Sequence, residues 1–193
     1  RYNWSVPVLR SLKTAVVDKK LTRIAIVGTP CVVQAARAIQ SSSNDLLIPF
    51  GRSIRLIIGL FCTESFDYHQ FMDEILNRNR GILPNQVSRM DIKGRLELSL
   101  TDGSVETIPL EEAARAVRKG CLSCDDFSAP DADISAGSIG TPTGFTTLII
   151  RTETGEGFMK RAVQAGFLST DEGVDTAGIE KLAASKKTRV DHQ

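Results

Sequence analysis

The fold is decided by the stretch Arg23-Ile24-Ala25-Ile26-Val27-Gly28-Thr29-Pro30-Cys31. Residues 23–27 form a short apolar run rich in β-branched side chains, which is typical of a buried strand. Residues 31–40 have helical character, and Pro30 suits the first helical position while Thr29 suits the N-cap. The stretch therefore predicts a strand that leads directly into a helix.

The same pattern recurs once farther along the chain. Residues 55–61 predict a second buried strand, and residues 63–78 predict an amphipathic helix. Two strand–helix units in succession predict a parallel sheet with right-handed crossovers.

The middle of the chain has a different character. Short runs at residues 87–92, 96–100 and 104–108 are separated by Lys93-Gly94-Arg95 and Thr101-Asp102-Gly103. These hairpin signals predict a small antiparallel meander. Beyond it we expect a helix over 109–119 ended by Gly120, a strand over 146–151, helices over 157–165 and 179–185, and a solvated tail over 186–189.

A loop over residues 121–144 completes the predicted organisation. It is too long to be a mere connector, so we expect it to be functional. The predicted fold class is α/β with α+β elements: a small parallel strand–helix layer, an antiparallel meander and a cysteine- and glycine-rich cofactor loop. A chain of 193 residues can bury one real core, so we expect a single domain over 1–193. Because the chain begins with Arg1 rather than Met, we expect a fragment that lacks an N-terminal portion.

Composition excludes several classes of function. A net charge of +1 argues against a nucleic-acid partner bound through a broad basic surface. No apolar run approaches the roughly 20 residues of a membrane span, and no signal peptide is present, so we expect a cytoplasmic protein, at most peripheral to a membrane complex. Four cysteines without secretory context indicate metal or redox chemistry rather than disulfides.

The four cysteines are the first candidate site. Cys31 and Cys62 each follow a predicted parallel strand, and ligands bind beyond the carboxyl ends of such strands. Cys121 and Cys124 are separated by two residues, a spacing that lets both sulfurs reach one metal or cluster. A shared cluster is favoured, with structural zinc and unrelated roles as alternatives, since a single buried cysteine is often only a small hydrophobe.

The glycine-rich segment of residues 135–144 is the second candidate site. Its backbone amides and hydroxyls could cradle a phosphate, although such a segment can also be a plain flexible loop. Gly28-Thr29-Pro30, before a predicted helix, is another possible anion site. No catalytic side chains are predicted: we expect His69 and His192 to be incidental, and the loop acids Asp125, Asp126, Asp131 and Asp133 to be solvated or capping.

Six motifs follow one another along the chain: residues 26–34 around Cys31, 59–64 around Cys62, 87–94, 120–127 around Cys121 and Cys124, 132–140 and 144–152. These motifs, in this order, resemble the beta subunits of coenzyme F420 hydrogenase and F420-linked dehydrogenases. A departure is Val32, at a position where glutamine is common in the family.

The resemblance implies an oxidoreductase subunit that transfers electrons between a [4Fe-4S] cluster and coenzyme F420 through FAD. It makes Cys31, Cys62, Cys121 and Cys124 the cluster ligands, and it makes Gly28, Thr29, Pro30, Gly137, Ser138, Gly140, Gly144 and Thr146 candidates for FAD contact. The implied partners are other subunits of a hydrogenase or dehydrogenase complex, or ferredoxin. The alternatives are a ferredoxin-dependent flavin and iron–sulfur reductase that does not use F420, and a zinc-stabilised, non-catalytic docking domain.

Overall fold

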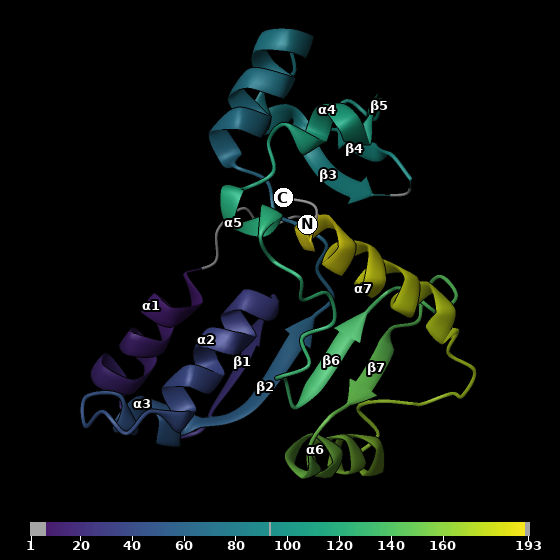
Figure 1. The fold of residues 1–193 in the computed structure, drawn as a ribbon. Helices are drawn as coiled ribbons and strands as arrows, with labels where there is room; N and C mark the ends of the chain where they lie inside the picture. Colours follow the sequence, from purple (N-terminus) through teal and green to yellow (C-terminus); the bar gives the residue numbers. More distant parts are fainter. Residues whose placement is uncertain (1–6, 93, 192–193) are drawn as a thin grey trace. The chain divides into compact units, whose positions relative to one another are not determined.

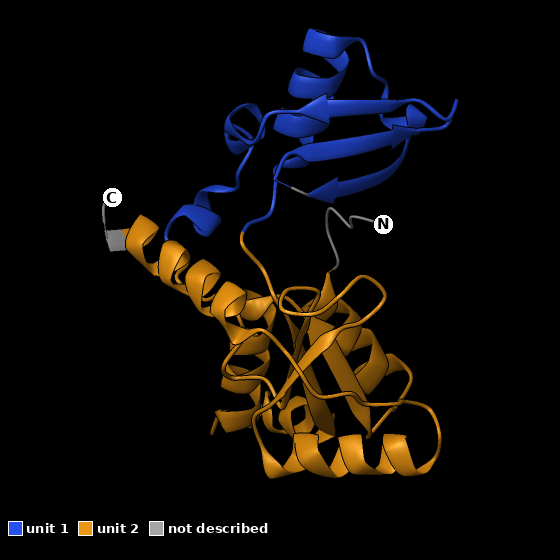
Figure 2. Cartoon of the chain, turned by 90° about the vertical axis from the view of Figure 1, so that its right-hand side faces the viewer, with its two compact units in different colours: residues 1–6, 64–123 blue, residues 7–63, 124–193 orange. Residues whose placement is uncertain are grey.

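A computed structural model describes residues 7–92 and 94–191, which form two compact units (Figure 2). Within the described residues, the first unit contains residues 64–123 and the second contains residues 7–63 and 124–191. No helix among the described residues is both long enough and apolar enough to span a membrane.

The second unit is built on a four-stranded sheet with the strand order β1-β2-β6-β7 (Figure 1). Its strands are β1 (Ile24–Gly28), β2 (Ile54–Leu60), β6 (Ile134–Gly137) and β7 (Thr147–Ile150). The first three run parallel, and β7 pairs with β6 in the antiparallel sense. This arrangement confirms the predicted parallel strand–helix layer and the strand predicted over 146–151.

Strand β6 corrects the prediction of an uninterrupted loop over 121–144. Its residues occupy the middle of the sheet, where Ile134 pairs with Ile58 of β2 and with Ile150 of β7. Four residues are too few to show a periodic pattern, and their pairing partners lie far away in the sequence. The segment is a strand because of its neighbours in the sheet.

Helices lie on both faces of this sheet: α2 (Pro30–Ser41) packs on one face and α6 (Glu153–Gln164) packs on the other. The other helical elements of the unit are α1 (Val8–Lys13), the π-helix η1 (Thr14–Asp18), α3 (Ile48–Ser53) and α7 (Thr176–Asp191). Successive side chains of a strand point to opposite faces. Accordingly, Ile57 of β2 packs in a core with Val33 of α2, whereas its neighbour Leu56 packs with Met159 of α6.

The helices of this unit differ from the predicted ones mainly at their ends. Helix α2 begins at Pro30 as predicted. Helix α6 begins four residues before the predicted start, because the hydroxyl of Thr152 accepts a hydrogen bond from the amide of Gly155 at its N-cap. The solvated tail predicted over 186–189 is wrong, since α7 continues through it to Asp191.

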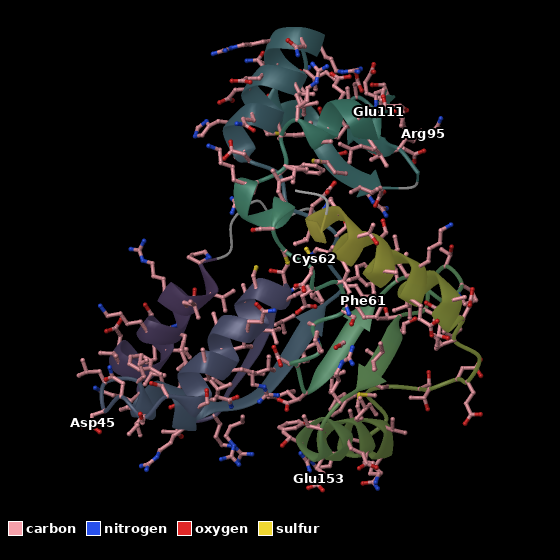
Figure 3. All side chains as sticks on the ribbon, viewed as in Figure 1. Asp45, Phe61, Cys62, Arg95, Glu111 and Glu153 are labelled. Atoms are coloured by element: carbon pink, nitrogen blue, oxygen red, sulfur yellow. The ribbon has the colours of Figure 1, made fainter. Side chains whose placement is uncertain are left out.

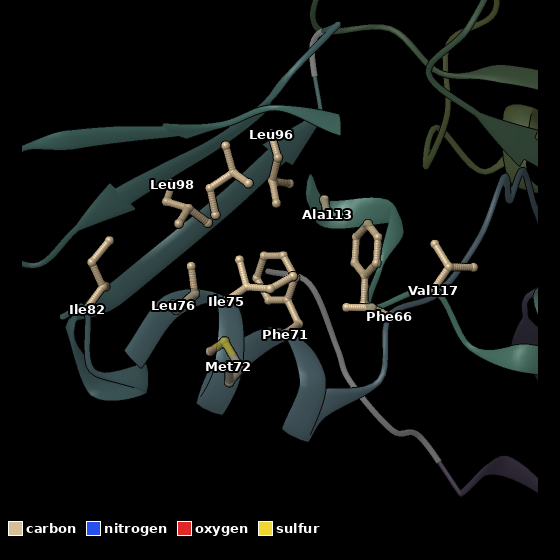
Figure 4. Close-up of a cluster of buried hydrophobic side chains, with 12 residues drawn as sticks. Phe66, Phe71, Met72, Ile75, Leu76, Ile82, Leu96, Leu98, Ala113 and Val117 are labelled. Atoms are coloured by element: carbon tan, nitrogen blue, oxygen red, sulfur yellow. The ribbon is translucent and has the colours of Figure 1, made fainter. Parts of the chain in front are cut away.

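The first unit is the predicted antiparallel meander with short helices. Its elements are the π-helix η2 (His69–Arg78), the 3-10 helix η3 (Pro84–Gln86), β3 (Val87–Ile92), β4 (Leu96–Leu100), β5 (Val105–Ile108), α4 (Leu110–Ala114) and α5 (Lys119–Leu122). The three strands pair in sequence order. Figure 4 shows the core between η2 and the sheet, where Phe71 and Leu76 face Leu96 and Leu98.

Two helices of this unit are shorter than predicted. The helix predicted over 63–78 begins only at His69, and the helix predicted over 109–119 ends at Ala114. The reason is a tertiary pairing: Phe66 and Val117 form an antiparallel bridge, which holds both segments in an extended conformation. Gly120 does not end a helix, because it lies inside α5.

Candidate cofactor site

The candidate site lies at the carboxyl edge of the parallel strands in the second unit. Gly28, the last residue of β1, pairs with Gly59 near the end of β2, and Leu60 pairs with Ala136 of β6. Cys31 therefore follows one strand and Cys62 follows the neighbouring strand at the same edge, as predicted. Figure 3 shows Phe61 and Cys62 at this edge, and Glu153 at the opposite end of the sheet.

A single segment, residues 124–127, is attached to both of these strand ends. The amide of Cys62 donates to the carbonyl oxygen of Phe127 at 2.9 Å. The amide group of Gln34, one helical turn after Cys31, donates to a carboxylate oxygen of Asp126 at 3.0 Å. The segment that contains Cys124 is thus hydrogen-bonded to Cys62 directly and to the helix that contains Cys31 through Gln34.

All four cysteines are free thiols. Cys31 is exposed, and its sulfur lies 3.2 Å from the hydroxyl of Thr29. The thiol of Cys124 donates to the carbonyl of Asp126 at 3.8 Å. Cys121 belongs to the first unit, where its sulfur accepts a hydrogen bond from the amide of Ser65. In the described part of the chain, no three Cys, His, Asp or Glu side chains are gathered as they would be around one metal ion.

A buried lysine that the sequence did not predict contacts two of the cysteine segments. Lys186 of α7 is 5% exposed, and its ammonium group donates to the carbonyl oxygens of Cys62 (2.9 Å) and Asp126 (2.6 Å). The helix period contained a signal for it, because Lys186 follows the buried Ile179 by seven residues and therefore lies on the same face. The lysine joins the backbone after β2 to the backbone after Cys124.

The acids of the loop separate into two kinds. Asp125 and Asp131 are exposed, as predicted. Asp126 and Asp133 are buried: Asp126 fits the capping alternative of the prediction, whereas Asp133 binds Arg37 and the amide of Ile57 and fits neither alternative. One carboxylate oxygen of Asp126 accepts a hydrogen bond from the amide of Ala129 at 2.8 Å. Asp126 therefore shapes the backbone of the segment that carries Cys124.

The glycines of the predicted FAD site are explained in part by packing. A Cβ on Gly28 would lie 2.6 Å from Val32, and a Cβ on Gly137 would collide with the ring of Phe61. Gly140 has a φ of +89° and Gly144 a φ of +97°, in the left-handed region that favours glycine.

Two hydroxyls of the predicted FAD site face solvent. Ser138 and Thr146 are exposed, and neither hydroxyl makes a hydrogen bond within the described residues, whereas Pro30 is buried. The contact of these residues with FAD stays a prediction.

The histidines contribute no catalytic arrangement within the described residues. His69 is exposed on η2, and its hydrogen bond with Asp73 raises the pKa of the imidazole. His192 lies outside the described residues.

The chain was compared with protein families and with known proteins. The family described as coenzyme F420 hydrogenase/dehydrogenase, beta subunit (C terminus), matches residues 21–176. An uncharacterized protein of Methanocaldococcus jannaschii is 47% identical over 191 residues, which are 98% of this chain and 52% of that protein. The coenzyme F420 hydrogenase subunit beta of Methanococcus voltae is 36% identical, over 95% of this chain and 66% of that protein.

A solved structure has the same fold. A chain of the F420-reducing [NiFe] hydrogenase complex from Methanosarcina barkeri matches with a TM-score of 0.85 and 28% identity, over 99% of this chain and 67% of that one. The chain thus spans about half to two thirds of the length of these relatives. The match confirms the predicted α/β fold class and the resemblance seen in the sequence, while the cofactor loop stays a prediction. The chain therefore belongs to the coenzyme F420 hydrogenase/dehydrogenase beta-subunit family, through the C-terminal region that the family description names.

Proposed function

We propose that this chain is the electron-transferring part of an F420-linked oxidoreductase. In this proposal, Cys31, Cys62, Cys121 and Cys124 hold a [4Fe-4S] cluster that exchanges electrons with coenzyme F420 through FAD. The observation that carries the proposal is that the segment 124–127, which contains Cys124, is hydrogen-bonded to Cys62 and to Gln34 of the helix that contains Cys31, in a chain of the F420 beta-subunit family. Cys121, three residues before Cys124, completes the set of four thiols.

The number and the chemistry of the four thiols support such a cluster. Four thiols outside any disulfide are the usual ligands of a [4Fe-4S] cluster. Thiolate ligands bring negative charge, which nearby cations and hydrogen-bond donors stabilise. Lys186 supplies a buried ammonium group that donates to two main-chain carbonyls. These partners are neutral, so the lysine keeps its positive charge beside the cysteine segments.

The proposed FAD contacts lie on the same edge of the sheet. Gly28, Thr29 and Pro30 lead into α2, a 12-residue helix whose first amides can face an anion. Ser138 and Thr146 offer hydroxyls that bond to nothing else in the described chain. Gly144 has no atom within 4 Å of its Cβ position, so the backbone can be approached closely there, whereas Gly137 and Gly140 would contribute main-chain groups only.

The protein's own role in this reaction is to position the cofactors. When bound, the cluster would pass single electrons, FAD would exchange one or two, and F420 would carry a hydride equivalent. No side chain of the described chain is assigned as an acid or base. The proposed partners are the other subunits of a hydrogenase or dehydrogenase complex, or ferredoxin, and the proposed location is the cytoplasm.

The direct test is electron transfer to F420. The complete protein, loaded anaerobically with iron, sulfide and FAD and reduced by dithionite, should bleach the absorbance of F420 after excess dithionite is removed. The Cys62→Ser variant should lose this activity, and the Ser123→Ala variant, which changes an exposed residue beside Cys124, should keep it. If reduced ferredoxin is oxidised but F420 is not bleached, the ferredoxin-dependent reductase replaces this proposal. If the protein is colourless with one zinc per chain, the docking domain replaces it.

A further inference from the structure

A cavity of about 710 Å³ opens at the amino edge of the same sheet, opposite the cysteines. It lies where β1 and β2 begin and where α6 starts, the edge at which Figure 3 shows Glu153. Strand β2 is seven residues long, so the two edges are roughly 20 Å apart. The cavity is therefore separate from the cysteine site.

Arginines dominate the lining of this cavity. Arg23 precedes β1, Arg52 lies in α3, Arg55 lies in β2 and Arg161 lies in α6. Among the described residues, none of these four guanidinium groups has an ion pair or a hydrogen bond, and Arg161 lies over the ring of Phe158 at 4.7 Å. Three elements and the segment before β1 thus bring unpaired positive charge to one cavity.

A fifth arginine in the lining, Arg37, differs from these four because every nitrogen of its guanidinium group is paired within the fold. Arg37 donates to the buried carboxylate of Asp133 at 2.6 Å, to the side chain of Gln40 and to the carbonyl of Asp131. This pairing leaves Glu153 as the remaining carboxylate in the lining, against four arginines. Like charges gathered around one cavity repel each other, and a bound anion relieves that repulsion.

We propose that this cavity binds a small molecule with two or more phosphate or carboxylate groups. Guanidinium groups bind both kinds of oxyanion through paired hydrogen bonds, and arginines on separate elements can hold several such groups at once. The volume falls in the range of small-molecule sites, and a cavity suits a small ligand better than a flat protein surface. The inference does not depend on the cluster or on FAD.

The test is calorimetric titration of the complete protein with pyrophosphate and, separately, with citrate. At least one of the two should bind, and Arg55→Gln should weaken that binding by about tenfold or more, because a charge-assisted hydrogen bond is lost. The matched control is Arg115→Gln, which removes an exposed arginine of the first unit and changes the net charge equally. Circular dichroism checks that both variants fold.

The two probes distinguish a phosphate ligand from a polycarboxylate ligand. A loss confined to Arg55→Gln with pyrophosphate supports a phosphate ligand, and the same loss with citrate supports a polycarboxylate. Should neither probe bind at millimolar concentration, the proposal is overturned. Equal weakening by Arg115→Gln also overturns it, because the binding would then follow net charge rather than the cavity.

Discussion

Replacing Lys186 by methionine tests the interaction that joins the cysteine segments. Methionine keeps an unbranched apolar stem of similar length but removes the ammonium group. The change deletes two hydrogen bonds, from Nζ to the carbonyl oxygens of Cys62 and Asp126. A hydrogen bond to a charged group contributes roughly 1.5–3 kcal/mol, and partial rehydration of the carbonyls recovers some of the loss. We therefore expect the free energy of unfolding to fall by about 3 kcal/mol.

Urea denaturation followed by circular dichroism, under reducing and anaerobic conditions, measures this loss. For a urea dependence of roughly 1–3 kcal/mol per molar, the midpoint should shift downward by about 1–3 M. The control is Lys187→Met, because Lys187 is exposed on the same helix and has no partner within the described residues. If Lys186→Met and Lys187→Met unfold at the same urea concentration, the structural role assigned to Lys186 is refuted.

Two further predictions concern packing and pH. Gly155→Ala should lower the free energy of unfolding by about 1–3 kcal/mol, because the added Cβ would collide with the main-chain carbonyl of Asp133. Gly157→Ala on the same helix should be neutral or stabilising in the same thermal denaturation, and equal losses for the two would contradict the packing argument. In the first unit, the hydrogen bond from Arg80 lowers the pKa of Glu112, so the pair stabilises above the unfolded-state pKa of that carboxyl. The stabilisation, roughly 0.5–1 kcal/mol relative to Glu112→Gln, should disappear as the pH falls through the lowered pKa, and a constant difference in urea midpoint across this range would exclude it.

The sequence predicted best those features that depend on neighbouring residues. The strands at residues 24–28 and 54–60 and the start of α2 at Pro30 follow from local apolar runs and from a helix-start signal. The meander was predictable because each turn contains a glycine, and Gly94 and Gly103 both have positive φ. Local chemistry is sufficient for such elements.

The features that the sequence did not predict depend on distant partners. Ser135 of β6 is fully buried, and its hydroxyl donates to the carbonyl of Ala129 while accepting from Arg151, so its burial is satisfied only in the folded chain. The extended conformation at Phe66 likewise requires Val117, about fifty residues away. Lys186 was assigned to a solvated tail because a charged residue near the end of a chain is usually exposed.

In the candidate site, too, the sequence predicted the features that depend on neighbouring residues and did not predict those that depend on distant ones. The positions of Cys31 and Cys62 after adjacent parallel strands follow from the strand–helix pattern. The attachment of Cys124 through Phe127 and the contact of Lys186 required the folded structure, because each is a hydrogen bond between segments far apart in the sequence.

Iron and acid-labile sulfide analysis of the anaerobically purified complete protein tests the central claim most directly. A [4Fe-4S] cluster on these cysteines predicts a brown protein with about four irons and four sulfides per chain, whose colour bleaches on addition of dithionite. Cys121→Ser should lower the iron content and the stability together, because cluster binding is coupled to folding. A colourless wild-type protein, or wild-type iron content in Cys121→Ser, would contradict the assignment of the four cysteines as ligands.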